Sequence, residues 1–372
     1  NVLFTSQRNV GHGGTLYAIS ALNFGSAVLA SHSIIEINNG VYTMLKDRIE
    51  DYKKLEEIRK SKLIVYFTSD RQNAETNIGA DVLAPFANHL DSIGDVEKIS
   101  LFLYSNGGST LAGWSIVNLI RSFCKDFEII VPFRCQSTAT LICLSADRII
   151  MTKQATLGPI DPSTNGLMNP QININGQIIR VPVSVEHVNG YIDMAKEDLG
   201  ITDCQELKEI YLKLTDHIHP LSLGNVYKSK SQIQMLAEKL LKYHKIDKEN
   251  VPKVISFLCS DSGSHDYTIY RKEAKNELGL NVDKPDDELY SIIKKIYQDI
   301  EKEMELRNPF NPNVILATQN PYNYSMRRAL IESIYGGCDV FLSEGNLSKQ
   351  SLPNGQSAIH DNRTFESWKH EN

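Results

Sequence analysis

The sequence predicts an α/β protein built around a mostly parallel β-sheet that is covered on both faces. Short apolar runs recur at residues 63–68, 98–104, 128–132 and 148–151, and segments with helical spacing of apolar residues separate them. Strands that alternate with helices at such short spacing form βαβ units and a parallel sheet. The runs are almost continuously apolar, which is typical of strands buried on both faces.

The composition is that of a large globular protein. The chain has 372 residues, of which 41% are hydrophobic, enough for a sizeable core in one or two domains. The formal net charge is −6, and without a basic run we expect no nucleic-acid partner. None of the six cysteines falls in a CxxC pair with metal spacing. Cys135 and Cys143 sit in apolar stretches, where we expect small buried residues rather than disulfide halves, which favours a reducing, cytoplasmic compartment. We expect no metal and no nicotinamide cofactor, because the histidines are scattered and no GxGxxG motif is present.

Residues 1–43 form a Gly- and Ser-rich N-terminal segment that contains the most apolar stretch of the chain, residues 15–30. This stretch is short for a spanning helix and includes Asn23. No basic region precedes it, as a signal peptide would require. We therefore expect a buried strand or a packing helix, with peripheral contact to a membrane surface as the alternative.

Charged helices and one hairpin are predicted around the sheet. Residues 44–61 form an amphipathic helix, which serves either as a subunit contact or as a solvated helix across the domain. Residues 166–183 alternate around isoleucines with an Asn-Gly turn, the pattern of a β-hairpin. Residues 184–245 are predicted to be helical with loops, and a second charged helix is expected over 280–305.

The Pro-rich stretch 308–312 predicts a linker. We therefore divide the rest of the chain into a main domain, residues 44–307, and a C-terminal appendage, residues 308–372. Within the appendage we expect a helix over 325–334, a short strand over 339–342 and a loosely ordered polar tail.

Two glycines and a serine follow the ends of apolar strands. Gly107 and Gly108 come after the strand 98–104, and a glycine pair lets the backbone turn sharply and approach a ligand closely. Ser137 opens a helix, where a serine is usually an N-cap. The same place suits a nucleophile, because a helix N-terminus favours negative charge and the N–H of Thr138 could hold an oxyanion together with a glycine N–H. The pattern therefore indicates acyl chemistry at a serine.

The surroundings of these residues resemble known serine peptidases. The turn with its following Ala112-Gly113 resembles the Clp-protease signature, with Asn106 in place of the proline of that signature. Residues 145–162 resemble the phrase after the nucleophile of signal-peptide-peptidase-A-like proteases. The closest resemblance is to the serine dehydrogenase proteinase family and spans about residues 62–295. Its characteristic pieces are Leu157–Pro162, His219–Asn225 and Ser264–Tyr267.

This resemblance implies a ClpP/crotonase-like fold, a parallel-sheet βαβ superhelix with helical additions. It also implies an ATP-independent serine endopeptidase whose substrate is an extended polypeptide bound along a strand edge. A homo-oligomer is implied as well. Two alternatives stay open. One is a relative that acts on a thioester such as an acyl-CoA, with Ser137 incidental. The other is an inactive scaffold, favoured by Ile160-Asp161 standing where Clp proteases carry a histidine.

The general base is not fixed by the sequence. His219 is the first choice, with Asp161 as the residue that orients it, since the family is described with Ser, Asp and His in that order. The plainer interpretations are a turn aspartate and a helix-capping histidine. Lys196 is the second choice and would need a lowered pKa. His265 is the third, in a turn before a helix where a structural role is expected.

Overall fold

The computed structural model describes residues 45–161, 163–164, 166–174, 177–351 and 357–371, and the backbone of residues 3–5. The apolar stretch 15–30 and the Asn-Gly turn of the predicted hairpin lie outside these residues. Among the helices that are described, none combines the length and the apolar character needed to cross a bilayer.

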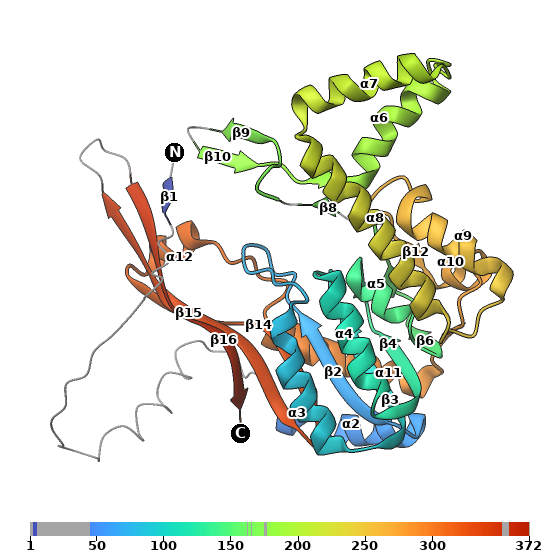
Figure 1. Cartoon of the computed structure of the whole chain (residues 1–372). Coiled ribbons are helices and arrows are strands. Elements are labelled where there is room, and N and C mark those ends of the chain that lie inside the picture. Colours follow the sequence, from blue (N-terminus) through green and yellow to red (C-terminus); the bar gives the residue numbers. More distant parts are fainter. Residues whose placement is uncertain are drawn as a thin grey trace, which may run out of the picture.

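A nine-stranded sheet forms the centre of the molecule (Figure 1), in the order β1-β16-β15-β14-β2-β3-β4-β6-β13. Five neighbouring strands run parallel: β2 (Lys62–Thr68), β3 (Val96–Tyr104), β4 (Cys124–Val131), β6 (Arg148–Met151) and β13 (Val282–Asp283). Helices connect the first four of them: α3 (Leu83–Ile93), α4 (Thr110–Arg121) and α5 (Thr138–Cys143). The predicted α/β class with parallel βαβ units is therefore confirmed.

Helices cover both faces of the parallel strands (Figure 1). On one face the core includes side chains of α3, α4, α5 and three later helices: α8 (Pro220–Leu241), α9 (Val251–Ser256) and α10 (Arg271–Asn276). On the other face it includes side chains of the two predicted charged helices: α2 (Leu45–Arg59) and α11 (Asp287–Glu303). Burial on both faces explains why the strands read as continuous apolar runs.

The C-terminal part differs from the prediction. The helix expected over 325–334 is instead a strand, β14 (Tyr322–Ser333), and the polar tail forms two long strands, β15 (Gly337–Ser351) and β16 (Ser357–Glu371). The short strand expected over 339–342 lies inside β15. Because β14 pairs antiparallel with β2, the sheet is mixed. The last five residues of β14, Ala329–Ser333, are all buried, and such a continuous run cannot be told from a helix by periodicity.

A small second sheet stands where the parallel strands end. Its order is β12-β7-β5, with β5 (Arg134–Cys135) parallel to β7 (Thr156–Leu157) and β12 (Ile269–Tyr270) antiparallel to β7. Two backbone bonds attach it to the chain beyond β3: Ser105 N–H donates to the carbonyl of Arg134 at 3.1 Å, and Gln136 N–H donates to the carbonyl of Ser105 at 3.0 Å. The residues after β5 are thereby fixed beside the turn that follows β3.

An arm projects from the body above α8 (Figure 1). It contains the predicted hairpin and two of the predicted helices: β9 (Gln171–Ile174), β10 (Gln177–Arg180), α6 (Val185–Glu197) and α7 (Cys204–His217). Two short antiparallel strands form its base: β8 (Ser163–Thr164) and β11 (Val183–Ser184). The remaining elements are β1 (Leu3–Thr5), α12 (Pro312–Thr318), two 3-10 turns (Ala80–Val82 and Lys248–Asn250) and a π-helical turn (Phe257–Asp261).

Candidate active site

Ser137 lies between β5 and α5 in a strained backbone conformation, with φ 52° and ψ −120°. A non-glycine residue with positive φ is uncommon, costs about 1–3 kcal/mol and is found preferentially at functional sites. Although Ser137 precedes the helix, its hydroxyl makes no capping hydrogen bond. The N-cap role therefore does not account for this serine. A strained turn from strand to helix is also how α/β-hydrolases expose a nucleophile.

The glycine turn lies directly against Ser137. Gly107 has φ 102°, and a Cβ added to it would lie 2.7 Å from the Cβ of Ser137 and 2.9 Å from the backbone nitrogen of Thr138. Only glycine permits this approach and this conformation. The Thr138 hydroxyl donates to the carbonyl of Gly108 at 2.7 Å. The structure thus brings the turn together with Ser137 and Thr138.

The hydrogen bonds of the turn distinguish its two amide groups. Gly107 N–H donates to the hydroxyl of Ser105 at 3.0 Å and is therefore engaged. The carbonyl of Gly107 accepts from Ile78 N–H at 2.8 Å, and in a trans peptide the following N–H, that of Gly108, points the opposite way. Thr138 N–H, at the start of α5, has no intrahelical acceptor. Of the three predicted oxyanion donors, Gly107 is thus the one whose N–H is engaged.

The small sheet brings Asp161 and His265 together. Ile269 of β12 pairs antiparallel with Leu157 of β7, so the chain before β12 and the chain after β7 run side by side. Asp161 Oδ1 lies 2.7 Å from His265 Nδ1. The aspartate is buried, whereas 54% of the His265 side chain is exposed. The hydrogen bond with Asp161 is the main cause that raises the pKa of His265.

Ser137 follows β5 and Asp161 follows β7, and these parallel neighbours end at the same edge of the small sheet. Gly158, directly after β7, donates its N–H to the Thr140 hydroxyl of α5 at 3.0 Å. The segment that leads to Asp161 therefore passes beside the helix that Ser137 opens. A hydroxyl, amide donors and an aspartate–histidine pair thus all follow or precede strand ends at one edge of the small sheet, and ligands of α/β sheets bind at strand ends.

The other base candidates lie elsewhere. His219 is exposed at the N-cap of α8, where its Nδ1 accepts from Leu221 N–H at 3.2 Å. The expected partnership of Asp161 with His219 is therefore not formed, and Asp161 pairs with His265 instead. Lys196 is exposed in the last turn of α6. The strands β7 and β12 have two residues each, too few for a sequence pattern to predict their pairing or the contact of Asp161 with His265.

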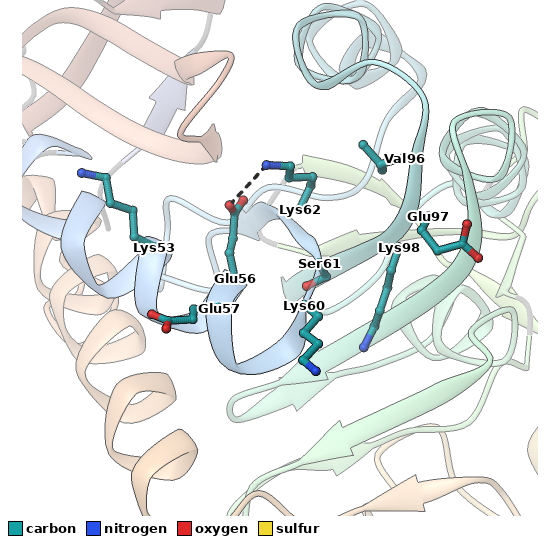
Figure 2. A pocket seen from close by; sticks show the side chains of 9 residues that line it. All are labelled: Lys53, Glu56, Glu57, Lys60, Ser61, Lys62, Val96, Glu97 and Lys98. Carbon is teal, nitrogen blue, oxygen red and sulfur yellow. Dashed lines mark ion pairs between the residues drawn. The ribbon is translucent and has the colours of Figure 1, made fainter.

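A hollow of about 430 Å³ opens at the opposite edge of the main sheet, where β2 and β3 begin (Figure 2). Charged side chains of both signs line most of it: Lys53, Glu56, Glu57, Lys60, Lys62, Glu97 and Lys98. Lys62 pairs with Glu56, and Lys98 pairs with Glu128. The hollow lies away from the carboxyl ends of the strands, and the serine in its lining, Ser61, has its hydroxyl bonded to that of Ser100 at 2.7 Å.

Residues 88–177 match the model of the family described as ClpP-like SDH-type serine proteinase. The matched segment contains the glycine turn, Ser137 and Asp161. The resemblance to the serine dehydrogenase proteinase family is therefore confirmed over these residues.

Two proteins of Methanocaldococcus jannaschii are similar to this chain, the uncharacterized proteins MJ0137 (28% identical over 205 residues) and MJ1495 (26% over 206 residues). Each match covers 55% of this chain, and the two cover 60% and 56% of the relatives. The chain thus spans little more than half the length of these relatives.

Two solved structures are also similar. A mutant of the 1510-N membrane-bound stomatin-specific protease has a TM-score of 0.34 at 16% identity, covering 64% of this chain and 85% of its own. ClpP1 from Listeria monocytogenes has a TM-score of 0.33 at 15% identity, covering 64% of this chain and 98% of its own.

Proposed function

We propose that this protein is a serine peptidase that hydrolyses peptide bonds with Ser137 as its nucleophile. The observation that carries the proposal is the strained backbone of Ser137, whose hydroxyl caps no helix and whose Cβ faces Gly107 at close range. The match of residues 88–177 to a family of serine proteinases supports the same chemistry.

His265 is the proposed general base. Its Nδ1–H donates to Asp161, which orients the ring and leaves Nε2 without a proton. Nε2 takes the proton of Ser137 as Oγ attacks the scissile carbonyl carbon. The N–H groups of Gly108 and Thr138 bind the resulting oxyanion.

The same histidine then acts as the acid. The protonated ring gives its proton to the leaving amine, so the C–N bond breaks and an ester remains on Ser137. A water molecule, deprotonated by His265, hydrolyses this ester and releases the acid product. The enzyme returns to its starting protonation state without an external reactant other than water.

An extended polypeptide that pairs along a strand edge is the proposed substrate. The family resemblance supports ATP-independent action, and it also supports assembly into a homo-oligomer. The cysteine usage supports a cytoplasmic location, since all six cysteines are free thiols and disulfides are rare in reducing compartments.

Labelling with a fluorophosphonate tests the nucleophile, with mass spectrometry to locate the label and casein hydrolysis as the second measurement. We expect the label on Ser137, and Ser137→Ala should abolish both reactions. Ser231→Ala, on the exposed side of α8, is the matched control and should change neither. A label at another residue, or casein hydrolysis that survives Ser137→Ala, would refute the proposal.

Two histidine variants test the base. His265→Gln should lower the labelling rate by a factor on the order of 10⁴ or more, because residues of such a unit act together. His219→Gln, at the N-cap of α8, should leave the rate within about a factor of two, since an exposed cap contributes only to local helix stability. The reverse pattern would reinstate His219 as the base.

A further inference from the structure

Glu186, at the base of the arm, lies beside the Asp161–His265 pair. Ser184 of β11 pairs antiparallel with Ser163 of β8. Glu186 and Asp161 each lie two residues from this pair, and α6 begins at Val185. His265 lies 2.7 Å from Asp161. A carboxylate carried by the arm thus lies near the aspartate–imidazole pair of the body, and the charges of Asp161 and His265 both act on it.

The carboxyl group of Glu186 is unusually placed for a surface helix. Its Oε1 is buried and has no hydrogen-bond partner among the residues that the structure describes. Burial, and then the charge of Asp161, raises the pKa of Glu186. The charges of His265 and His187 and a hydrogen bond with the backbone of His265 act in the opposite direction and favour the ionised carboxylate. A buried carboxylate oxygen that is left unpaired is costly to keep. Its retention beside an ionisable pair therefore points to a function there.

The charges around His265 come from three elements. Asp161 follows β7, Asp266 directly follows His265 in the loop before β12, and Glu186 belongs to α6. All three raise the pKa of His265, with the hydrogen bond to Asp161 first and burial of the ring as the opposing cause. Glu186 is the only member of this set that belongs to the arm.

We infer that Glu186 is a positioning residue for His265, and that it couples the placement of the arm to the protonation of the base. The inference rests on the proposed function, in which His265 acts on Ser137. Glu186 is the second residue of α6, and α6 leads outward into α7 (Figure 1). A movement of α7 would therefore be transmitted along α6 to Glu186 and from there to His265. Glu186 does not touch the reacting atoms and acts by holding the histidine loop and stabilising the imidazolium.

The direct test is an NMR titration of His265 in the full chain, with ¹³C-labelled histidine and His265→Gln to assign the signal. Glu186→Gln keeps the shape of the side chain and removes its charge. We expect it to lower the pKa of His265 by about half a unit or more, as loss of a neighbouring opposite charge does. Glu197→Gln, exposed at the end of the same helix, is the matched control and should leave the pKa unchanged.

A second variant and a second measurement separate positioning from a loss of folding. Glu186→Asp retains the charge and should restore part of the pKa shift. The acid limb of the fluorophosphonate labelling profile should move to lower pH in Glu186→Gln, in step with the titration. A pKa of His265 that is the same in the parent, Glu186→Gln and Glu186→Asp overturns the inference. Because the titration needs no activity, an unreactive Ser137 would defeat the proposed function and leave this result readable.

Discussion

Replacing Gly107 by alanine should damage both the fold and the nucleophile, and its cost follows from the geometry of the turn. The added methyl carbon would lie 2.7 Å from the Gln136 carbonyl oxygen, 2.7 Å from the Ser137 Cβ and 2.9 Å from the Thr138 nitrogen. None of these atoms belongs to a side-chain end that could rotate away. Forcing an extra methyl group into such packing costs about 1–3 kcal/mol, and the positive φ adds about 1–2 kcal/mol for an L-residue.

Gly94→Ala is the matched control. Gly94 follows α3 with φ 72°, and a Cβ added there would meet no atom within 4 Å. Gly94 has ψ −174°, a backbone conformation that side chains disfavour, so this variant should lose only the backbone contribution of about 1–3 kcal/mol. Urea unfolding of the two variants measures the difference, which isolates the steric contribution of about 1–3 kcal/mol.

The reactivity of Ser137 gives a second, independent measurement. A displacement of about 1 Å at a reacting group costs on the order of 100-fold in rate, so fluorophosphonate labelling of Gly107→Ala should slow by about that factor. Gly94→Ala should be labelled at the parent rate. If Gly107→Ala unfolds no more easily than Gly94→Ala and reacts as fast as the parent, the turn does not press on the nucleophile, and the proposed site loses its basis.

Two further perturbations test other parts of the argument. Labelling should accelerate as the pH rises through the pKa of His265, because only the neutral ring accepts a proton, and Asp161 raises that pKa. Asp161→Asn should therefore move the rise to lower pH while reducing the plateau rate by about 10⁴; a profile that stays in place would contradict the assigned pair. Arg48→Met should cost about 3–5 kcal/mol in urea unfolding, since it leaves the fully buried Glu332 without its cation. A loss below about 1 kcal/mol would show that the core tolerates this carboxylate unpaired.

The features that could be predicted from the sequence are those fixed by neighbouring residues. The four apolar runs became strands of the parallel sheet because each is buried on both faces. Gly107 and Ser137 could be singled out because a strand end followed by a turn, or by a helix, is a local signal. Their meeting could be anticipated because the carboxyl ends of parallel strands share one edge of the sheet.

The Asp161–His265 pair could not be predicted in this way. Its members are 104 positions apart in the chain and meet through strands of two residues each. The position of His219 after a helix favours it as a base, yet Pro220 directly after it occupies the first turn of α8. A proline there is a helix-start signal, and it identifies His219 as a cap of the next helix. That signal was present in the sequence and outweighs the interpretation as a base.

The helix predicted over 325–334, where the structure has β14, is wrong for a related reason. Its central residues favour a helix by intrinsic propensity, and Glu332 reads as part of a helix surface. In the structure Glu332 is buried and bonds to Tyr52 and to Arg48, which is 284 positions away. Pairing with β2 and this distant cation decide the conformation, and neither is visible in a window of neighbouring residues.

Ser105 shows how the main sheet imposes the geometry of the site. Its hydroxyl is buried and accepts from the Thr68 hydroxyl at 2.7 Å, at the end of β2. It also accepts from Gly107 N–H at 3.0 Å. Its backbone bonds to Arg134 of β5 and to Gln136 directly after this strand. One serine therefore fixes the glycine turn and the strand before Ser137 to the same pair of parallel strands. The strain at Ser137 is sustained by this attachment, because relaxing it would break bonds that the sheet already holds in place.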